Sequence, residues 1–171
     1  MRAKKAGKCI TTFWGKNRRF NIMAIKAKFD IDKLFEGVYA KVEDIQDAVI
    51  EAIKAACLQT VANARRLDTY KDRTTLLRSS IGFVIYDHGT KVADNFEARN
   101  GEKGSEGVAI GKRVAEQAAA SWPNSIVAVV VAGADYALYV ESKGYDVISG
   151  PCSELNGLLK QYLAQAVASF K

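Results

Sequence analysis

The sequence contains few of the residues that most often carry chemistry. It has one histidine, His88, and three cysteines, Cys9, Cys57 and Cys152, with no paired spacing. An odd set of this kind argues against a disulfide framework and against a zinc site, and it fits a reducing compartment. Cys57 falls on the apolar face of a predicted helix, where we expect a small core residue. No Ser or Cys is placed by the sequence as a nucleophile for His88, so we expect this histidine to be an exposed turn residue.

Long apolar runs and nucleotide-binding loops are also missing. No stretch of 18 or more apolar residues occurs, so neither a transmembrane helix nor a membrane partner is expected. The N-terminal stretch lacks the apolar region and the cleavage site of a secretory signal. Residues 107–113 approach a phosphate loop, but three residues instead of four separate the glycines, and Arg113 stands where Ser or Thr is needed. A glycosidase-like pair of Asp135 and Glu141 is conceivable, but a helix cap and a pairing charge explain these residues better. We therefore predict no enzyme activity, no cofactor and no metal site.

Positive charge is concentrated at the N-terminus. The formal net charge is +6, yet residues 1–22 hold seven Lys and Arg and no acid, whereas the rest of the chain holds 18 bases and 19 acids. Because residues 23–171 carry no net positive charge, their charge does not favour nucleic-acid binding, and DNA contact is expected only through residues 1–22. Two interpretations of residues 1–22 stay open. They are either a disordered tail or upstream extension, with Met23 as a natural start, or a functional basic arm.

Residues 23–171 have the composition of a single α+β domain. Apolar residues make up 49% and charged residues 26% of the chain, which is typical of a globular protein with one core. The apolar, mostly β-branched run 126–132 predicts a strand, and the lack of alternating polar residues predicts that both of its faces are covered. Residues 81–86 predict a second strand, followed by a turn at 87–89. The two strands should be neighbours in one antiparallel sheet.

Helices are predicted on both sides of these strands in the sequence. Apolar residues spaced by three and four predict a long helix over 42–67, after a short helix capped by Asp30. Ser153 can cap a last helix that ends near Phe170. Between the strands, Ala93 to Gly107 reads as a mobile loop, and 108–122 as a helix. The predicted fold is therefore a small antiparallel sheet packed by a long N-terminal helix and a C-terminal helix, with an inserted loop–helix segment.

Two motifs in this order of elements resemble a known family. Asp-Thr at 68–69 and Leu-Arg-Ser-Ser-Ile at 77–81 form a connector motif, and Gly-Ala-Asp-Tyr-Ala-Leu-Tyr-Val-Glu occupies 133–141. Over about residues 25–170 the chain resembles the tail-completion or head–tail joining (neck) proteins of long-tailed, double-stranded-DNA bacteriophages. The connector of that family usually reads Val-Asp-Thr-Gly-Arg-Leu-Arg-Arg-Ser-Ile, and Tyr70 stands here in place of its glycine. The second motif usually continues with Phe-Gly-Thr, whereas this chain has Ser-Lys-Gly.

The resemblance implies a structural virion protein without enzymatic activity. Such proteins are made in the cytoplasm of the host bacterium and form rings, with six subunits favoured here, between phage connector and tail-tube proteins. We expect the surface around Tyr136, Tyr139 and Glu141 of one subunit to meet the connector around Arg73 and Arg78 of the next, because unlike patches can close a ring and tyrosine is enriched at interfaces. The alternative is a small α+β nucleic-acid-binding protein that uses residues 1–22 as a basic arm. An enzyme that depends on His88 is a distant third interpretation.

Overall fold

The computed structural model describes residues 31–169, which form five helices and three strands. The elements are α1 (Ile31–Arg66), α2 (Leu76–Ser79), β1 (Ile81–Asp87), β2 (Thr90–Asn95), α3 (Gly104–Ala119), β3 (Ile126–Ala132), α4 (Ala137–Ser142) and α5 (Ser149–Ala168). The basic tail, Cys9, the predicted Asp30 cap and the predicted helix end at Phe170 lie outside the described residues.

The three strands form one antiparallel sheet in the order β2-β1-β3. β1 pairs with β3 over the whole length of both strands, from Ile81 opposite Ala132 to Asp87 opposite Ile126. This confirms that the two apolar runs are neighbours in one antiparallel sheet and that the fold is α+β. β1 and β2 are joined by His88 and Gly89, whose φ angles of 46° and 82° are those of a tight hairpin turn. His88 is therefore an exposed turn residue, as predicted.

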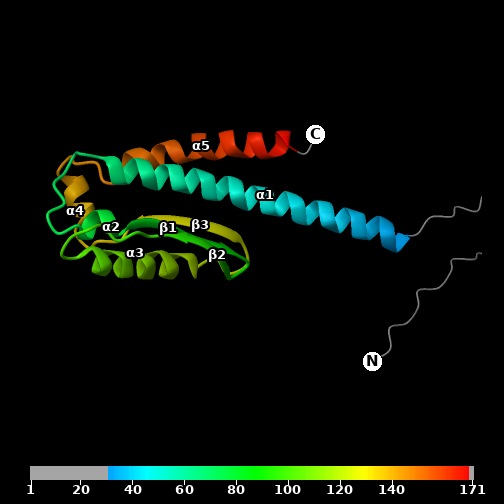
Figure 1. The fold of residues 1–171 in the computed structure, drawn as a ribbon, viewed down its shortest axis with the longest axis horizontal. Coiled ribbons are helices and arrows are strands. Elements are labelled where there is room, and N and C mark those ends of the chain that lie inside the picture. Colours follow the sequence, from blue (N-terminus) through cyan, green and yellow to red (C-terminus); the bar gives the residue numbers. More distant parts are fainter. Residues whose placement is uncertain (1–30, 170–171) are drawn as a thin grey trace, which may run out of the picture.

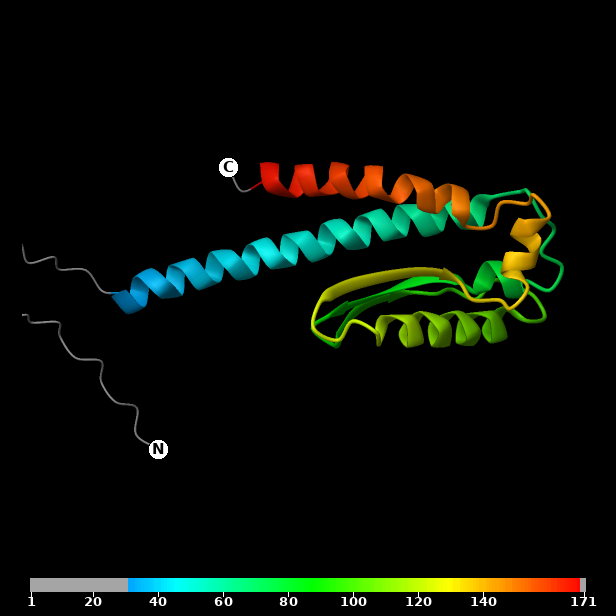
Figure 2. The same cartoon turned by 180° about the vertical axis from the view of Figure 1, so that it is seen from behind.

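Helices cover both faces of the sheet (Figure 1). On one face α1 packs on β1, and the core there includes Cys57, Val61 and Phe83, each no more than 2% exposed. On the other face Val84 packs with Ala115 of α3. The C-terminal helix α5 lies along α1, so the inserted helix, and not α5, covers the second face (Figures 1 and 2). The prediction of a packing role for the C-terminal helix therefore needs this correction: its partner is α1.

The long helix begins at Ile31, well before the predicted start at Val42. Gly37 does not end it, because one glycine in a helix interior costs only about 1 kcal/mol relative to alanine. The added turns extend past the sheet and carry no described element against them (Figure 2). Val42 and Ile45 are consequently 53% and 50% exposed, although they belong to the apolar stripe that packs on the sheet farther along the helix.

The segment predicted as a mobile loop is irregular over residues 96–103, whereas its two ends belong to β2 and α3. Ala93 belongs to β2, and Gly107 lies in the first turns of α3. β2 was missed because its sequence, Thr-Lys-Val-Ala-Asp-Asn, is polar and most of its side chains are exposed. The glycines serve close packing: a Cβ at Gly107 would lie 2.4 Å from the Leu76 carbonyl oxygen, and one at Gly111 would lie 2.5 Å from that of Ser80. The same packing explains the glycine spacing that resembled a phosphate loop.

Two predicted helix caps are wrong. α5 begins at Ser149, with Pro151 in its first turn, where a missing N–H costs nothing. The Ser153 hydroxyl instead donates a hydrogen bond of 2.6 Å to the Gly150 carbonyl inside the helix. α4 has no side-chain cap, and Asp135 lies in the turn before it. Other groups satisfy these helix ends: the Ala137 N–H donates to the Ala134 carbonyl (2.9 Å), and the Gly150 N–H donates to the Asp146 carboxylate (3.0 Å).

Candidate functional site

The two motifs meet at one end of the sheet, and we call this region the motif junction (residues 68–80 and 133–149). Ser80 joins them: its carbonyl oxygen accepts a hydrogen bond from the Gly133 N–H (3.1 Å), and its Oγ accepts one from the Ala134 N–H (3.0 Å). The Thr69 hydroxyl donates to the Asp146 carbonyl on the way into α5. Two segments that are far apart in the sequence are therefore held as one structural unit.

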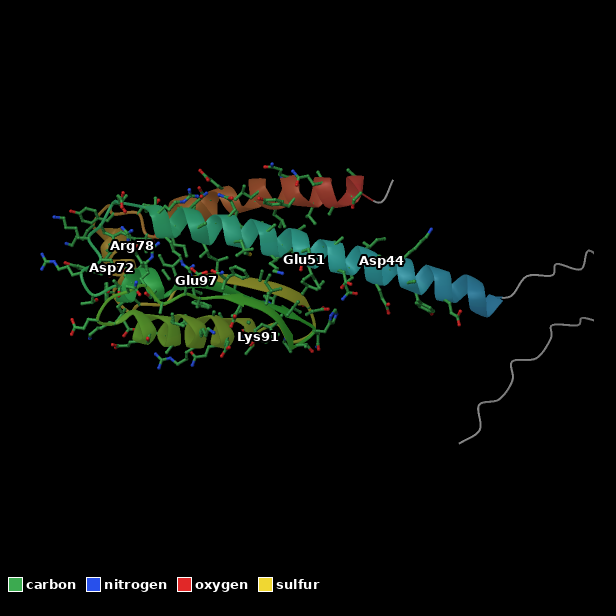
Figure 3. The ribbon with its side chains drawn as sticks, viewed as in Figure 1. Asp44, Glu51, Asp72, Arg78, Lys91 and Glu97 are labelled. Carbon is green, nitrogen blue, oxygen red and sulfur yellow. The ribbon has the colours of Figure 1, made fainter. Side chains whose placement is uncertain are left out.

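Arg78, from the first motif, binds the C-terminal end of α1 (Figure 3). Its guanidinium donates hydrogen bonds to the carbonyl oxygens of Arg65 (3.3 Å) and Leu67 (2.6 Å), and the backbone N–H of Arg78 donates to the Asp72 carboxylate (2.8 Å). The last carbonyls of a helix have no partner within the helix, and they carry partial negative charge. Arg78 is therefore a cap for α1, and its side chain is only 18% exposed.

Tyr70, the residue after the Asp-Thr pair of the first motif, supports this cap. The Arg78 guanidinium carbon lies 5.2 Å from the centre of the Tyr70 ring, close enough for a cation–π contact. Burial raises the pKa of Tyr70 to about 12, although the positive charge of Arg78 opposes the shift. The open cleft beside this pair is lined by both acidic and basic side chains, among them Asp68, Asp72 and Arg99.

Glu141, from the second motif, binds the N-terminal end of α5. Its Oε1 accepts hydrogen bonds from the backbone N–H groups of Val147 (3.3 Å), Ile148 (2.9 Å) and Ser149 (2.9 Å), and its Oε2 accepts one from the Ser149 hydroxyl (2.8 Å). A carboxylate suits the unpaired N–H groups and the positive end of a helix. Burial alone would raise the pKa of Glu141, but these hydrogen bonds outweigh burial and lower it. Glu141 is therefore the cap of α5 rather than the pairing charge that we expected.

Removal of this cap should destabilise the protein. We expect Glu141→Ala to lower the free energy of unfolding by about 2 kcal/mol, and Glu141→Gln by less, because an amide oxygen still accepts hydrogen bonds. Since the folded-state pKa of Glu141 is lowered, its contribution is present above the ordinary glutamate pKa and is lost as the pH falls through the folded-state pKa. Urea denaturation at neutral pH and near pH 3 would measure both effects. Glu154→Ala, at an exposed position of α5, is the control; equal stability of the Glu141 and Glu154 variants would contradict the capping role.

The predicted interface residues divide into two groups. Arg78 and Glu141 are engaged within the subunit, as described above. Arg73, Tyr136 and Tyr139 lie at the surface, with Tyr136 42% and Tyr139 62% exposed. Burial raises the pKa of Tyr136. The negative charge of Asp72 in the connector raises this pKa further, whereas a hydrogen bond with the Thr74 side chain lowers it. The two patches predicted to meet between subunits are thus neighbours within one subunit.

Sequence reasoning missed two exposed apolar residues at this end of the molecule. Leu138 is 77% exposed on α4, and Tyr145, in the turn before α5, is 51% exposed. Helical spacing could have predicted the exposure of Leu138. Residues 137 and 140 share one face of α4, Ala137 on that face is buried, and the next residue in a helix points in another direction. We call Tyr136, Leu138, Tyr139, Tyr145 and the exposed Arg73 the junction surface.

Comparisons with models of protein families, with curated proteins and with solved structures gave no match for this chain. Between residues 31 and 169, no three His, Cys, Asp or Glu side chains gather as they would around a metal ion. None of the helices in this range combines the length and apolarity that crossing a membrane requires.

Proposed function

We propose that this chain is a structural virion protein of a tailed bacteriophage or prophage, acting in tail completion or head–tail joining and assembling as a ring. The observation that carries the proposal is the motif junction. The two motifs on which the resemblance rests pack on each other and fix the ends of both long helices, through Arg78 for α1 and Glu141 for α5. A shared role in one structural unit is a physical reason for both motifs to occur together.

The junction surface supports an assembly role. Four large apolar side chains between residues 136 and 145 are exposed, which is more than the scattered apolar residues of an ordinary surface. Lys143 lies over the exposed ring of Tyr139, with its Nζ 5.2 Å from the ring centre. Apolar side chains that gather at one end of a molecule favour burial against another protein.

A ring needs a second, unlike patch, because a head-to-tail contact joins two different surfaces. The connector adjoins α4 in the same subunit, so a patch farther from the junction surface suits a head-to-tail contact better. The protruding N-terminal half of α1 fits better, with exposed Val42 and Ile45 beside acids such as Asp44 (Figure 3). Arg73 of the junction surface has the opposite charge. In the proposed ring, this half of α1 from one subunit packs on the junction surface of the next.

Deletion of the gene from the phage or prophage that encodes the chain tests the function. We expect electron microscopy of the lysate to show DNA-filled heads and separate tails, and the titre of infectious particles to fall by several orders of magnitude. Expression of the wild-type chain in trans should restore both. Infectious, fully joined particles at normal titre from the deletion strain would contradict the proposal.

The basic tail favours one other candidate function, nucleic-acid binding through residues 1–22. Full-length protein and a chain that starts at Met23 should be compared for DNA binding over a range of salt concentrations. A basic arm predicts affinity that falls steeply with salt and is lost with the tail. Under the virion proposal, head–tail joining should survive the removal of residues 1–22.

A further inference from the structure

The two edges of the sheet differ in their protection against further pairing. On β2, Lys91 forms ion pairs with Asp94 (3.1 Å) and with Glu116 of α3 (2.8 Å). The ladder between β1 and β2 also contains a bulge at Ile85 and Tyr86. Charged side chains and bulges are the devices by which proteins prevent an edge strand from pairing with another chain. The β2 edge is therefore protected.

The outer edge of β3 has none of these devices. Its seven residues, Ile-Val-Ala-Val-Val-Val-Ala, include no charge and no proline, and the register with β1 is regular throughout. No described strand pairs with its outer side. Ala128 is exposed and the other six residues are only half-buried, although the apolar run predicted full coverage. A long, regular, apolar edge with unpaired backbone groups is a template for an added strand.

An apolar groove runs beside this edge. It is lined by Ala118 of α3, by Trp122 and Ser125 between α3 and β3, and by the first five residues of β3, and its volume is about 510 Å³. Trp122 is 55% exposed there. Strand addition gains affinity from main-chain hydrogen bonds and selectivity from the side chains that flank the edge. The uncharged lining of the groove therefore selects a strand without charged side chains.

We propose that β3 pairs antiparallel with β3 of a second copy of this chain, so that the two sheets become one six-stranded sheet. Among the described strands, β1 is already paired on both sides, and β2 carries Lys91 and Asp94. Only β3 matches the uncharged edge and groove. A contact of a surface with itself has two-fold symmetry, and two-fold pairing of strands is antiparallel.

Full overlap fixes the register of this pair. Ile126 lies opposite the partner's Ala132, Val127 opposite the partner's Val131, and Val129 opposite its own counterpart on the two-fold axis. The pairing uses neither the junction surface nor the protruding half of α1. This dimer goes beyond the proposed function. Because the dimer is measured on the purified protein and head–tail joining is measured on the phage, either proposal can fail without contradicting the other.

Cysteine cross-linking tests the register in full-length protein that carries Cys9→Ser and Cys152→Ser and keeps the buried Cys57. Directly opposed residues of antiparallel strands have Cα atoms about 4.5–5.5 Å apart, within the range of a disulfide. Val129→Cys should therefore give a disulfide-linked dimer, at twice the chain mass of 18.7 kDa. Val127→Cys alone should not cross-link, whereas Val127→Cys with Val131→Cys should. Absence of the Val129→Cys dimer, or equal cross-linking of Val127→Cys alone, would overturn the register and the pairing.

A charge placed on the edge tests the dimer without cross-linking. Ala128→Lys puts a lysine at the exposed position of β3, and Val92→Lys makes the same change at an exposed position of β2. Sedimentation equilibrium should show a wild-type dimer whose dissociation constant rises at least about tenfold in Ala128→Lys and is unchanged in Val92→Lys. Circular dichroism checks that both variants are folded. A wild-type chain that stays monomeric at about 100 µM refutes the proposal, as does a dimer whose dissociation constant is unchanged by Ala128→Lys.

Discussion

Replacement of Gly111 by alanine should lower the free energy of unfolding by about 3 kcal/mol. The new Cβ would lie 2.5 Å from the Ser80 carbonyl oxygen and 2.7 Å from a ring carbon of Phe96. The Ser80 carbonyl cannot retreat freely, because it accepts the hydrogen bond from Gly133 that joins the two motifs. Relief of the clash therefore requires α3 to move away from the sheet or the motif junction to open.

Gly157→Ala is the matched control, since Gly157 also lies inside a helix. No atom lies within 4 Å of a Cβ built at Gly157, so alanine should stabilise α5 by up to about 1 kcal/mol. The same chemical change thus has opposite expected signs at the two positions. Urea denaturation followed by circular dichroism measures both. A Gly111→Ala variant as stable as the wild type would show that α3 does not approach β1 and β3 so closely.

Arg65→Met should lower the free energy of unfolding by about 3 kcal/mol, because Arg65 holds α1 to the ends of two strands. Its guanidinium is buried and donates to the Ile81 carbonyl (3.2 and 2.8 Å) and to the Asn95 carbonyl (3.2 Å). Burial lowers the pKa of Arg65, and an ion pair with Glu97 (3.3 Å) opposes that shift. Methionine would fill most of the volume but leave two inward-facing carbonyls without these donors.

Two further variants separate the hydrogen bonds from helix propensity and from charge. Arg66→Met removes an exposed neighbour that bonds only within α1, so a loss below about 0.5 kcal/mol is expected. Arg65→Lys keeps the positive charge but lacks the planar guanidinium, so its loss of unfolding free energy should lie between those of Arg65→Met and Arg66→Met. Thermal and urea unfolding of the three proteins give the ranking. Equal losses for Arg65→Met and Arg66→Met would argue against the bridging role of Arg65.

The elements that depend on side-chain periodicity could be predicted from the sequence. Runs of β-branched residues predicted β1 and β3 at nearly their observed bounds, and apolar residues spaced by three and four predicted most of α1. β2 could not be predicted in this way, because its polar residues form a strand only where β1 offers an edge. The glycines of α3 suggested flexibility, and only the approach of Leu76 and Ser80 shows that they are needed for packing.

The sequence by itself determined the α+β class, the pairing of the two apolar strands, and the two motifs of the candidate site, although not Leu138 and Tyr145. The tertiary structure decided what those residues do. Arg78 and Glu141 carry opposite charges, which suggested a contact between subunits, but each binds a helix end within its own chain. The free N–H and C=O groups of a helix end are satisfied by whichever segment packs there. Arg78 lies 11 residues after Leu67, and Glu141 lies eight residues before Ser149, so the chain must turn back before either cap forms, and no helix or strand period predicts that turn.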